Sequence, residues 1–377
     1  MKSFVVSVAI LMSLASPALS QFVPPPDGVV SKSMQAASAF PLPEHAAERM
    51  TRPFQSTDRD PDWKVVRLMA ELSFLAYEDS IPAVQNRLRL FDLVLGEFVT
   101  IDNHHFITAW DAKRDVLIVA FRGTDIAQLA DVWTDLDYAK IKTDTGEVHK
   151  GFYKASEAMM RSVVAAIEHR GRPQHVWLTG HSLGGAIATL TMRQLESRGH
   201  RVGGLVTFGQ PRVGDRAFTE EMNRKLGSRI LRVINEDDVV VSLPPRIPLV
   251  LPAYYSGGNA IQFLDGKLKQ SGGVRLMAKP PIDGVIGDGT TPQVDLDLLA
   301  PQTPSGKVPP DPEPLTAEQF EELKQILNDR DGSVADEQTY GGPLGGPMDR
   351  LDLKRRAGNH PMHLYIQNIE RFAAEGK

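Results

Sequence analysis

Ser182 is enclosed by two glycines in the stretch LTGHSLGGAIATL, with the spacing Gly180-x-Ser-x-Gly184. A strand that passes directly into a helix must turn sharply, and the residue at the apex exposes its side chain. Glycines beside the apex lack the Cβ atoms that would collide across such a turn. The pattern predicts that Ser182 is a nucleophile at a strand-to-helix turn.

The flanking residues have the composition that this turn requires. HVWLT, residues 175–179, is a short apolar run typical of a strand, and residues 184–197 have the character of a helix. The N-terminus of that helix carries a partial positive charge, which favours negative charge near the serine oxygen.

A serine hydroxyl is a poor nucleophile alone, so it needs a base, and the base needs an orienting acid. Where the nucleophile occupies such a turn, the chain order is Ser, then Asp or Glu, then His. His360 and His363 are the histidines that follow residue 238. We favour His360, because Pro361 moves the preceding residue out of the helical region and is suited to start a helix itself. His363 then falls in the first turn of that helix.

The acid is expected at the carboxyl end of a strand, where ligands and catalytic groups gather in parallel sheets. ILRVI, residues 230–234, reads as a strand and is followed by NEDDVVVSLPP. Asp237 and Asp238 both qualify, and Glu236 is a third candidate. Spacing alone does not choose between the two aspartates.

The surrounding elements alternate between strand-like and helix-like runs, which predicts an α/β fold with a mostly parallel sheet and helices on both faces. Near-continuous apolar strands such as VLIVAF fit burial on both sides. The expected strands are 106–110, 116–121, 175–179, 205–209 and 230–234, and the expected helices are 63–77, 155–170, 184–197 and 361–373.

Composition bounds the class of protein. The 377 residues are 42% hydrophobic and 24% charged, with a net charge of -5, which describes an ordinary globular protein. The mild acidity argues against nucleic acid as a partner, because nucleic acid calls for a basic face. No cysteine occurs, so thiol nucleophiles and thiolate metal sites are excluded.

Four segments are expected along the chain. Residues 1–20 combine Lys2, a short apolar run and a small-x-small pattern, which predicts a signal peptide cut before Gln21. Residues 21–58 read as a loosely held, Pro-rich arm. The catalytic domain is expected over 59–377, with a loop-rich insertion at about 265–350 before the C-terminal helix; one helix, 316–328, is predicted inside it.

Several stretches together resemble the class 3 lipases, an α/β-hydrolase family that includes fungal triacylglycerol lipases and feruloyl esterases. The resemblance implies an α/β-hydrolase-type fold. The matching stretches are VAFRGTD (119–125), VWTDL (132–136), VHKGFY (148–153), LTGHSLGGAIATL (178–190), VTFGQPRVGD (206–215), VINEDDVVVSLPP (233–245) and NHPMHLY (359–365).

The resemblance also implies roles for particular residues. It selects Asp238 over Asp237 as the acid, and it supports His360 as the base. It implies that Thr124 and Leu183 form the oxyanion hole, whose paired N–H groups stabilise the acyl oxygen by several kcal/mol in the transition state. The motif residues expected to be structural are His149, His181, Arg122, Asp135 and Asp215.

This sequence departs from the family in the segment after Thr124. DIAQLADVW, residues 125–133, is short and only partly apolar, whereas many of these lipases carry an amphipathic lid there. The long gap between Asp238 and His360 and the absence of cysteine also distinguish it from the fungal enzymes. A secreted bacterial type of relative fits these features better.

We therefore expect a secreted serine carboxylic-ester hydrolase of lipase type that uses Ser182, His360 and Asp238 and needs no metal or organic cofactor. The expected partner is a lipid or other ester substrate, such as one presented at a lipid–water interface, with no nucleic acid and no membrane span. Alternative substrates are phospholipids, feruloyl esters and polyesters, and acyl transfer to an alcohol is an alternative reaction. A non-catalytic lipid-binding module on the same fold is the alternative from another class.

Overall fold

The protein was studied as a computed structural model. It describes residues 46–52, 54–56, 61–124, 139–244, 253–264, 267–271, 318–319, 321–322 and 360–374. The predicted signal peptide (1–20), the segment 125–133, Asp135 and most of the predicted insertion lie outside these residues. Of the helix predicted over 316–328, the described residues 318, 319, 321 and 322 are helical.

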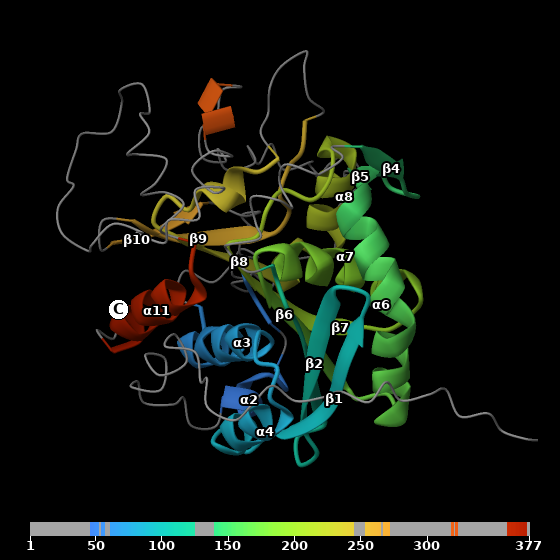
Figure 1. The fold of residues 1–377 in the computed structure, drawn as a ribbon, viewed down its shortest axis with the longest axis vertical. Helices are drawn as coiled ribbons and strands as arrows, with labels where there is room; N and C mark the ends of the chain where they lie inside the picture. The colour runs from blue at the N-terminus through green and yellow to red at the C-terminus, as the bar shows by residue number, and fades with distance from the viewer. Residues whose placement is uncertain are drawn as a thin grey trace, which may run out of the picture.

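A central sheet organises the described chain (Figure 1). Its strand order is β1-β2-β3-β6-β7-β8-β9-β10, and the pairs from β3 through β9 are parallel. The pairs β1–β2, β2–β3 and β9–β10 are antiparallel. The strands are β1 Val94–Ile101, β2 His104–Asp111, β3 Val116–Phe121, β6 His175–His181, β7 Val202–Phe208, β8 Ile230–Asn235, β9 Asn259–Leu264 and β10 Lys267–Ser271, with β4 Lys140–Lys142 and β5 Glu147–His149 in a separate pair.

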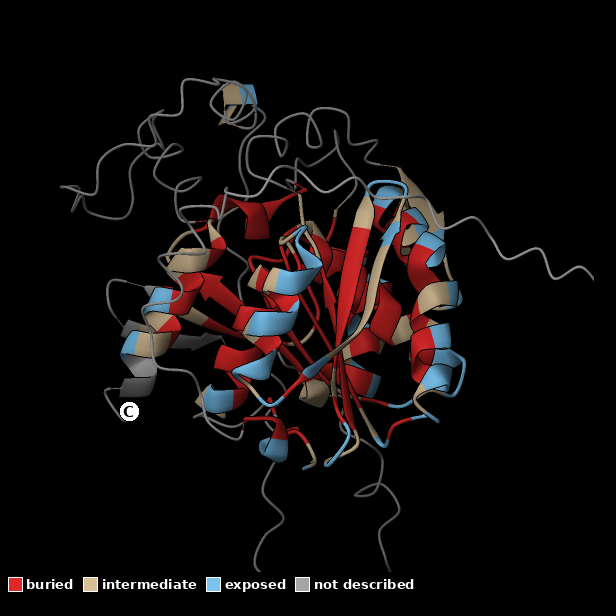
Figure 2. Ribbon diagram, turned by 60° about the horizontal axis from the view of Figure 1, so that its bottom comes forward, coloured by how far each residue is buried: buried red, intermediate tan, exposed pale blue. Residues whose placement is uncertain are grey.

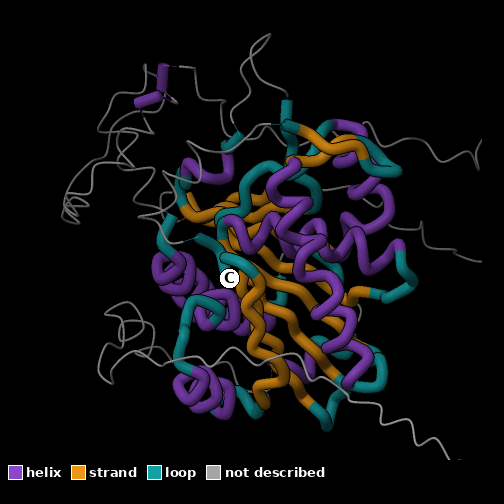
Figure 3. The backbone as a smooth tube through the Cα atoms, turned by 45° about the vertical axis from the view of Figure 1, so that its right-hand side comes forward, coloured by secondary structure: helices purple, strands orange, loops and turns teal. Residues whose placement is uncertain are grey.

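Helices cover both faces of this sheet (Figures 1 and 3). One face is covered by α6 and α7, with α8 nearby, and the other by α2, α3, α4 and α11. The helices are α2 Ala46–Arg49, α3 Trp63–Leu75, α4 Ile81–Arg89, α6 Lys150–His169, α7 Leu183–Ser197, α8 Arg216–Leu226 and α11 Met362–Ala374, with short 3-10 helices at η1 Gly227–Arg229 and η2 Val239–Ser242. The predicted α/β fold class is confirmed.

Two hydrophobic cores fill the space between the sheet and its helices. In β6, Leu178 contributes to the core under α6 and α7, while the adjacent Trp177 contributes to the core under α3 and α11. Successive side chains of a strand point to opposite faces, so each central strand supplies both cores. Figure 2 shows the central strands as continuously buried, in agreement with the apolar run of β3.

The prediction of a loose arm over 21–58 is wrong for its last part. Met50 is fully buried, and its carbonyl oxygen accepts a hydrogen bond from the Trp177 indole nitrogen at 3.0 Å. The Phe54 ring meets Trp177 edge-on, with ring centroids 5.1 Å apart. Ser56 donates to the Gly227 carbonyl at 3.0 Å. The proline content misled the prediction, because a few apolar anchors are enough to hold such a segment in the core.

The C-terminal part of the sheet extends past the predicted start of the insertion at about 265. The β9–β10 hairpin pairs Lys267 with Leu264, and β9 pairs with β8, so residues 267–271 belong to the sheet.

The final helix begins at Met362 rather than Pro361, a difference of the size expected at helix ends. His360 lies outside the helix and His363 lies in its first turn, as the sequence predicts.

Candidate active site

The strand-to-helix turn places Ser182 between β6 and α7 with a strained backbone. Its φ is 55° and its ψ is -128°, a conformation that residues other than glycine rarely adopt. A Cβ atom on Gly180 would lie 2.4 Å from the Gly184 carbonyl group, and one on Gly184 would lie 2.2 Å from the Phe121 carbonyl oxygen. Both glycines are therefore required by the close approach of backbone segments.

The predicted oxyanion-hole residues lie on the two segments nearest to the serine. Leu183 is the first residue of α7, so its N–H is among those that the helix itself leaves without a partner. Thr124 follows Gly123, and a Cβ atom on Gly123 would lie 3.2 Å from the Ser182 Cβ. The end of the β3 segment thus passes directly beside the nucleophile.

Asp238 and His360 meet in the interior although they are far apart in the chain. His360 Nδ1 and Asp238 Oδ2 are 2.7 Å apart, and their side chains are 1% and 0% exposed. Asp237, the rival candidate, is only half-buried. Because a buried carboxylate needs partners, the structure singles out Asp238 as the aspartate that can orient an imidazole.

Two further donors fix the Asp238 carboxylate. Oδ1 accepts the Val240 N–H at 2.8 Å, and Oδ2 accepts the Tyr365 hydroxyl at 2.6 Å. Burial, followed by the charge of Asp238, raises the pKa of Tyr365 well above its usual range, so the hydroxyl keeps its proton and donates. Tyr365 lies in the motif NHPMHLY, but nothing in its spacing predicts a contact with Asp238.

The atoms between which a proton would pass are buried and have no hydrogen-bond partner within the described part of the chain. They are Ser182 Oγ and His360 Nε2. The end of β7 lies beside both residues. On the serine side, the Ser182 N–H donates to the Phe208 carbonyl at 2.9 Å. A Cβ atom on the next residue, Gly209, would lie 2.9 Å from His360 Cε1. Gly209, with a φ of 55°, therefore lets the imidazole pack against the end of β7.

Three residues predicted to be structural have structural contacts. His149 caps α6, with Nδ1 accepting the Gly151 N–H at 3.2 Å. Asp215 caps α8 by accepting the Phe218 N–H at 2.8 Å. Arg122 pairs with Asp79 at 2.7 Å.

Arg212 is a fully buried residue whose structural role is not predicted from the sequence. Its Nη1 donates to the carbonyl oxygens of Ser242 and Pro244, at 2.5 and 3.0 Å, and so holds the segment that follows Asp238. Only its place in the motif VTFGQPRVGD marks it in the sequence.

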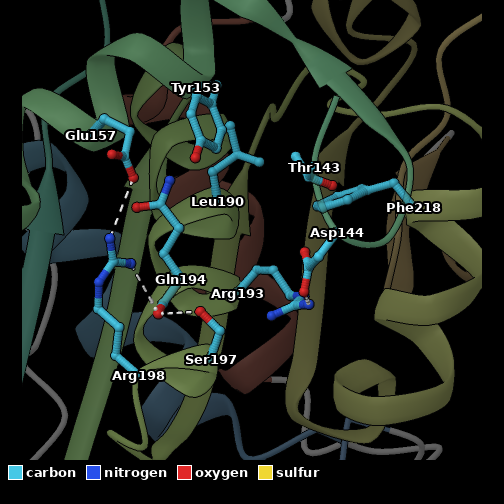
Figure 4. A pocket seen from close by; sticks show the side chains of 10 residues that line it. All are labelled: Thr143, Asp144, Tyr153, Glu157, Leu190, Arg193, Gln194, Ser197, Arg198 and Phe218. Carbon is cyan, nitrogen blue, oxygen red and sulfur yellow. Dashed lines mark hydrogen bonds and ion pairs between the residues drawn. The ribbon is translucent and has the colours of Figure 1, made fainter. Parts of the chain in front are cut away.

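A cleft of about 210 Å³ is lined by residues of α6 and α7 and by Thr143 and Asp144 (Figure 4). Ion pairs line it: Arg193 with Asp144 at 2.6 Å, and Arg198 with Glu157 at 3.6 Å. None of the predicted site residues lines this cleft, so it is separate from the candidate active site.

The described residues contain no group of three or more histidine, aspartate or glutamate side chains placed to hold a metal ion. Within the same residues, no helix has both the length and the apolar content needed to cross a membrane.

The mostly parallel sheet with helices on both faces, and the strained serine turn at the end of β6, are those of an α/β-hydrolase-type fold. Residues 118–247 match the family described as Lipase (class 3).

The sequence is similar to those of several lipases and phospholipases over part of its length. A lipase of Rhizomucor miehei is 32% identical over 154 residues, which are 38% of this chain and 41% of that protein. The chloroplastic phospholipase A(1) DAD1 of Arabidopsis thaliana is 38% identical over 90 residues, 23% of this chain and 20% of that protein. The chain thus spans less than half the length of these two relatives. A solved triacylglycerol lipase, whose catalytic centre is described as a serine protease triad, aligns with a TM-score of 0.47 and 25% identity over 55% of this chain and 82% of that chain.

Proposed function

We propose that this protein is a serine carboxylic-ester hydrolase of lipase type that cleaves acylglycerol esters. The observation that carries the proposal is the buried His360–Asp238 hydrogen bond of 2.7 Å at the end of the sheet where Ser182 occupies its strained turn. A buried imidazole oriented by a carboxylate is the arrangement that activates a serine hydroxyl.

In the proposed reaction, Ser182 Oγ attacks the ester carbonyl carbon while its proton passes to His360 Nε2. The carbonyl oxygen takes up the negative charge and accepts hydrogen bonds from the backbone N–H groups of Thr124 and Leu183. The tetrahedral intermediate then expels the alcohol, which receives the proton from His360. Water attacks the acyl-enzyme by the same route and releases the fatty acid. Asp238 stays ionised throughout and stabilises the imidazolium.

Phospholipid is the second candidate substrate, and the relative named as a phospholipase A(1) favours it. Both substrates present a carboxylic ester to the same nucleophile, so the chemistry of the triad does not separate them. Chain-length profiling with nitrophenyl esters, followed by competition between triacylglycerol and phosphatidylcholine, distinguishes a lipase from a phospholipase. It also separates both from feruloyl esterase or acyltransferase activity.

The nucleophile is tested with an organophosphonate ester probe. One adduct is expected, on the peptide that contains Ser182, and Ser182→Ala is expected to lower kcat by about 10⁴- to 10⁶-fold. Labelling at another residue, or near wild-type activity in Ser182→Ala, contradicts the triad. Absence of both labelling and hydrolysis favours a non-catalytic lipid-binding module.

Export is part of the proposal. The basic start, the apolar run and the small-x-small pattern in residues 1–20 support cleavage before Gln21. N-terminal sequencing of the protein recovered outside the cytoplasm is expected to begin at Gln21. A cytoplasmic protein that begins at Met1 contradicts this localisation.

A further inference from the structure

His181, the residue directly before the nucleophile, makes hydrogen bonds through both ring nitrogens. Nε2 lies 2.9 Å from the backbone carbonyl oxygen of His360, and Nδ1 lies 2.8 Å from the Tyr77 hydroxyl. The side chain is buried at 3% exposure. The β6 strand that presents Ser182 is therefore tied to the main chain of the residue proposed as the base.

The partners dictate where the protons of this ring lie. A backbone carbonyl can only accept, so His181 Nε2 carries the hydrogen and donates it to His360. In a neutral ring Nδ1 then accepts, and the Tyr77 hydroxyl is the donor. Burial, followed by the charge of His360, lowers the pKa of His181 well below its usual range, which keeps the ring neutral. Tyr77 thus selects the tautomer that holds the His360 backbone.

The His360 imidazole is packed between the His181 ring and the backbone of Gly209. The rings of His181 and His360 have centroids 4.5 Å apart and an angle of 30° between their planes. Gly209 lies close against the His360 ring, where even a Cβ atom would lie 3.0 Å from Nδ1. The imidazole therefore has little freedom to rotate or shift relative to β6.

Tyr77 also contacts the segment that leads to Thr124. A Cβ atom on Gly123 would lie 2.3 Å from the Tyr77 hydroxyl oxygen, and the Arg122 guanidinium lies over the Tyr77 ring at 5.8 Å. One tyrosine thus contacts the β3 segment beside the nucleophile and fixes the histidine that holds His360.

We propose that His181 and Tyr77 are positioning residues, which set the place of the His360 main chain relative to Ser182 through a hydrogen-bonded chain from Tyr77 to His181 to the His360 carbonyl. The inference rests on the proposed hydrolase function. His360 lies outside α11, so the helix alone does not fix it, whereas the hydrogen bond from His181 attaches it to the strand that presents the nucleophile. A misplacement of about 1 Å between catalytic groups costs about 100-fold in rate.

The test compares substitutions that keep or remove the donor to His360. His181→Leu removes it, and kcat is expected to fall by about 10- to 100-fold with KM within about twofold of wild type, because the ring faces His360 and not the substrate. His181→Gln can present an amide N–H to the same carbonyl and is expected to recover at least tenfold of a 100-fold loss. Tyr77→Phe removes one hydroxyl and is expected to lower kcat by about 3- to 10-fold, again at constant KM.

Thr179→Val is the matched control. Thr179 is fully buried in the same strand and donates to the Val206 carbonyl at 2.8 Å, but its hydrogen bonds do not involve His360. This variant is expected to lower the melting temperature while kcat stays within about threefold of wild type, since the lost hydrogen bond contributes to stability.

Two outcomes overturn the inference. In the first, the kcat values of His181→Leu and Tyr77→Phe are no lower than that of the control Thr179→Val. In the second, His181→Gln is as slow as His181→Leu, which would show that a hydrogen-bond donor to the His360 carbonyl is irrelevant. Tyr77→Phe decides the first comparison if His181→Leu fails to fold. The rate of organophosphonate labelling separates the two proposals: an unlabelled wild type contradicts the hydrolase function, whereas equal labelling rates in wild type and His181→Leu contradict only the positioning role.

Discussion

Asp238→Asn is expected to lower kcat by about 10³- to 10⁴-fold while leaving the fold intact. The reason lies in the donors around the carboxylate. Val240 donates a backbone N–H to Oδ1, while His360 and Tyr365 approach Oδ2 at 2.7 and 2.6 Å. The Val240 N–H cannot become an acceptor, so the asparagine must keep its oxygen on that side and turn its NH₂ group toward His360 and Tyr365.

This orientation keeps a hydrogen bond on each side of the asparagine side chain but reverses the imidazole. His360 Nδ1 and the Tyr365 oxygen can each accept one hydrogen of the NH₂ group, but the Tyr365 O–H loses the acceptor that Oδ2 supplied. The folded state is therefore expected to lose about 1 to 3 kcal/mol of stability and to stay folded. The proton of the neutral imidazole then resides on Nε2, and this nitrogen can no longer take the proton of Ser182. The wrong tautomer and the lost negative charge together raise the activation free energy by about 4 to 5.5 kcal/mol, which is the stated rate loss.

Steady-state kcat on a short nitrophenyl ester, with the melting temperature measured in parallel, tests this. Asp237→Asn is the control, because Asp237 is half-buried and is not the carboxylate bonded to His360; its kcat is expected to stay within about threefold of wild type. If Asp238→Asn retained more than a tenth of the wild-type kcat, or if Asp237→Asn were equally impaired, the assigned hydrogen-bond network would not be the one used in catalysis.

His360→Ala is expected to be almost inactive and His363→Ala to stay active in the same assay, and the reverse result would show that the wrong histidine has been assigned as the base. Arg67→Met is expected to lower the free energy of unfolding in urea by about 3 kcal/mol, because buried Glu71 and half-buried Glu370 both lose this guanidinium and Glu71 keeps only Arg87, at 2.9 Å; a loss under about 1 kcal/mol would contradict this. Burial, and then the charge of Arg122, lowers the pKa of His105 from 6.5 to about 4. Below pH 6.5, His105 is protonated in the unfolded chain but stays neutral in the folded protein. This difference lowers the free energy of unfolding by up to about 3 kcal/mol as the pH falls to about 4. His105→Gln removes the difference, so its free energy of unfolding is expected to fall less steeply with acid than that of the wild type.

The sequence by itself determined the local features of the site. Strand β3 was predicted with its observed bounds, and α7 to within one residue, because apolar periodicity reports burial directly. The turn at Ser182 follows from backbone sterics, since Gly180 and Gly184 lie where no Cβ atom fits. The position of His360 outside the helix follows from the restriction that Pro361 imposes on the preceding residue.

Only the tertiary structure decided which groups meet. Residue spacing left Asp237 and Asp238 equal, and their difference lies in burial and in a hydrogen bond to a residue far along the chain. The contact of His181 with the His360 carbonyl and the packing of Met50 under Trp177 are likewise long-range. Local sequence patterns encode the period and ends of an element, whereas such contacts depend on how the strands are ordered in the sheet and on which side chains then share the same buried space.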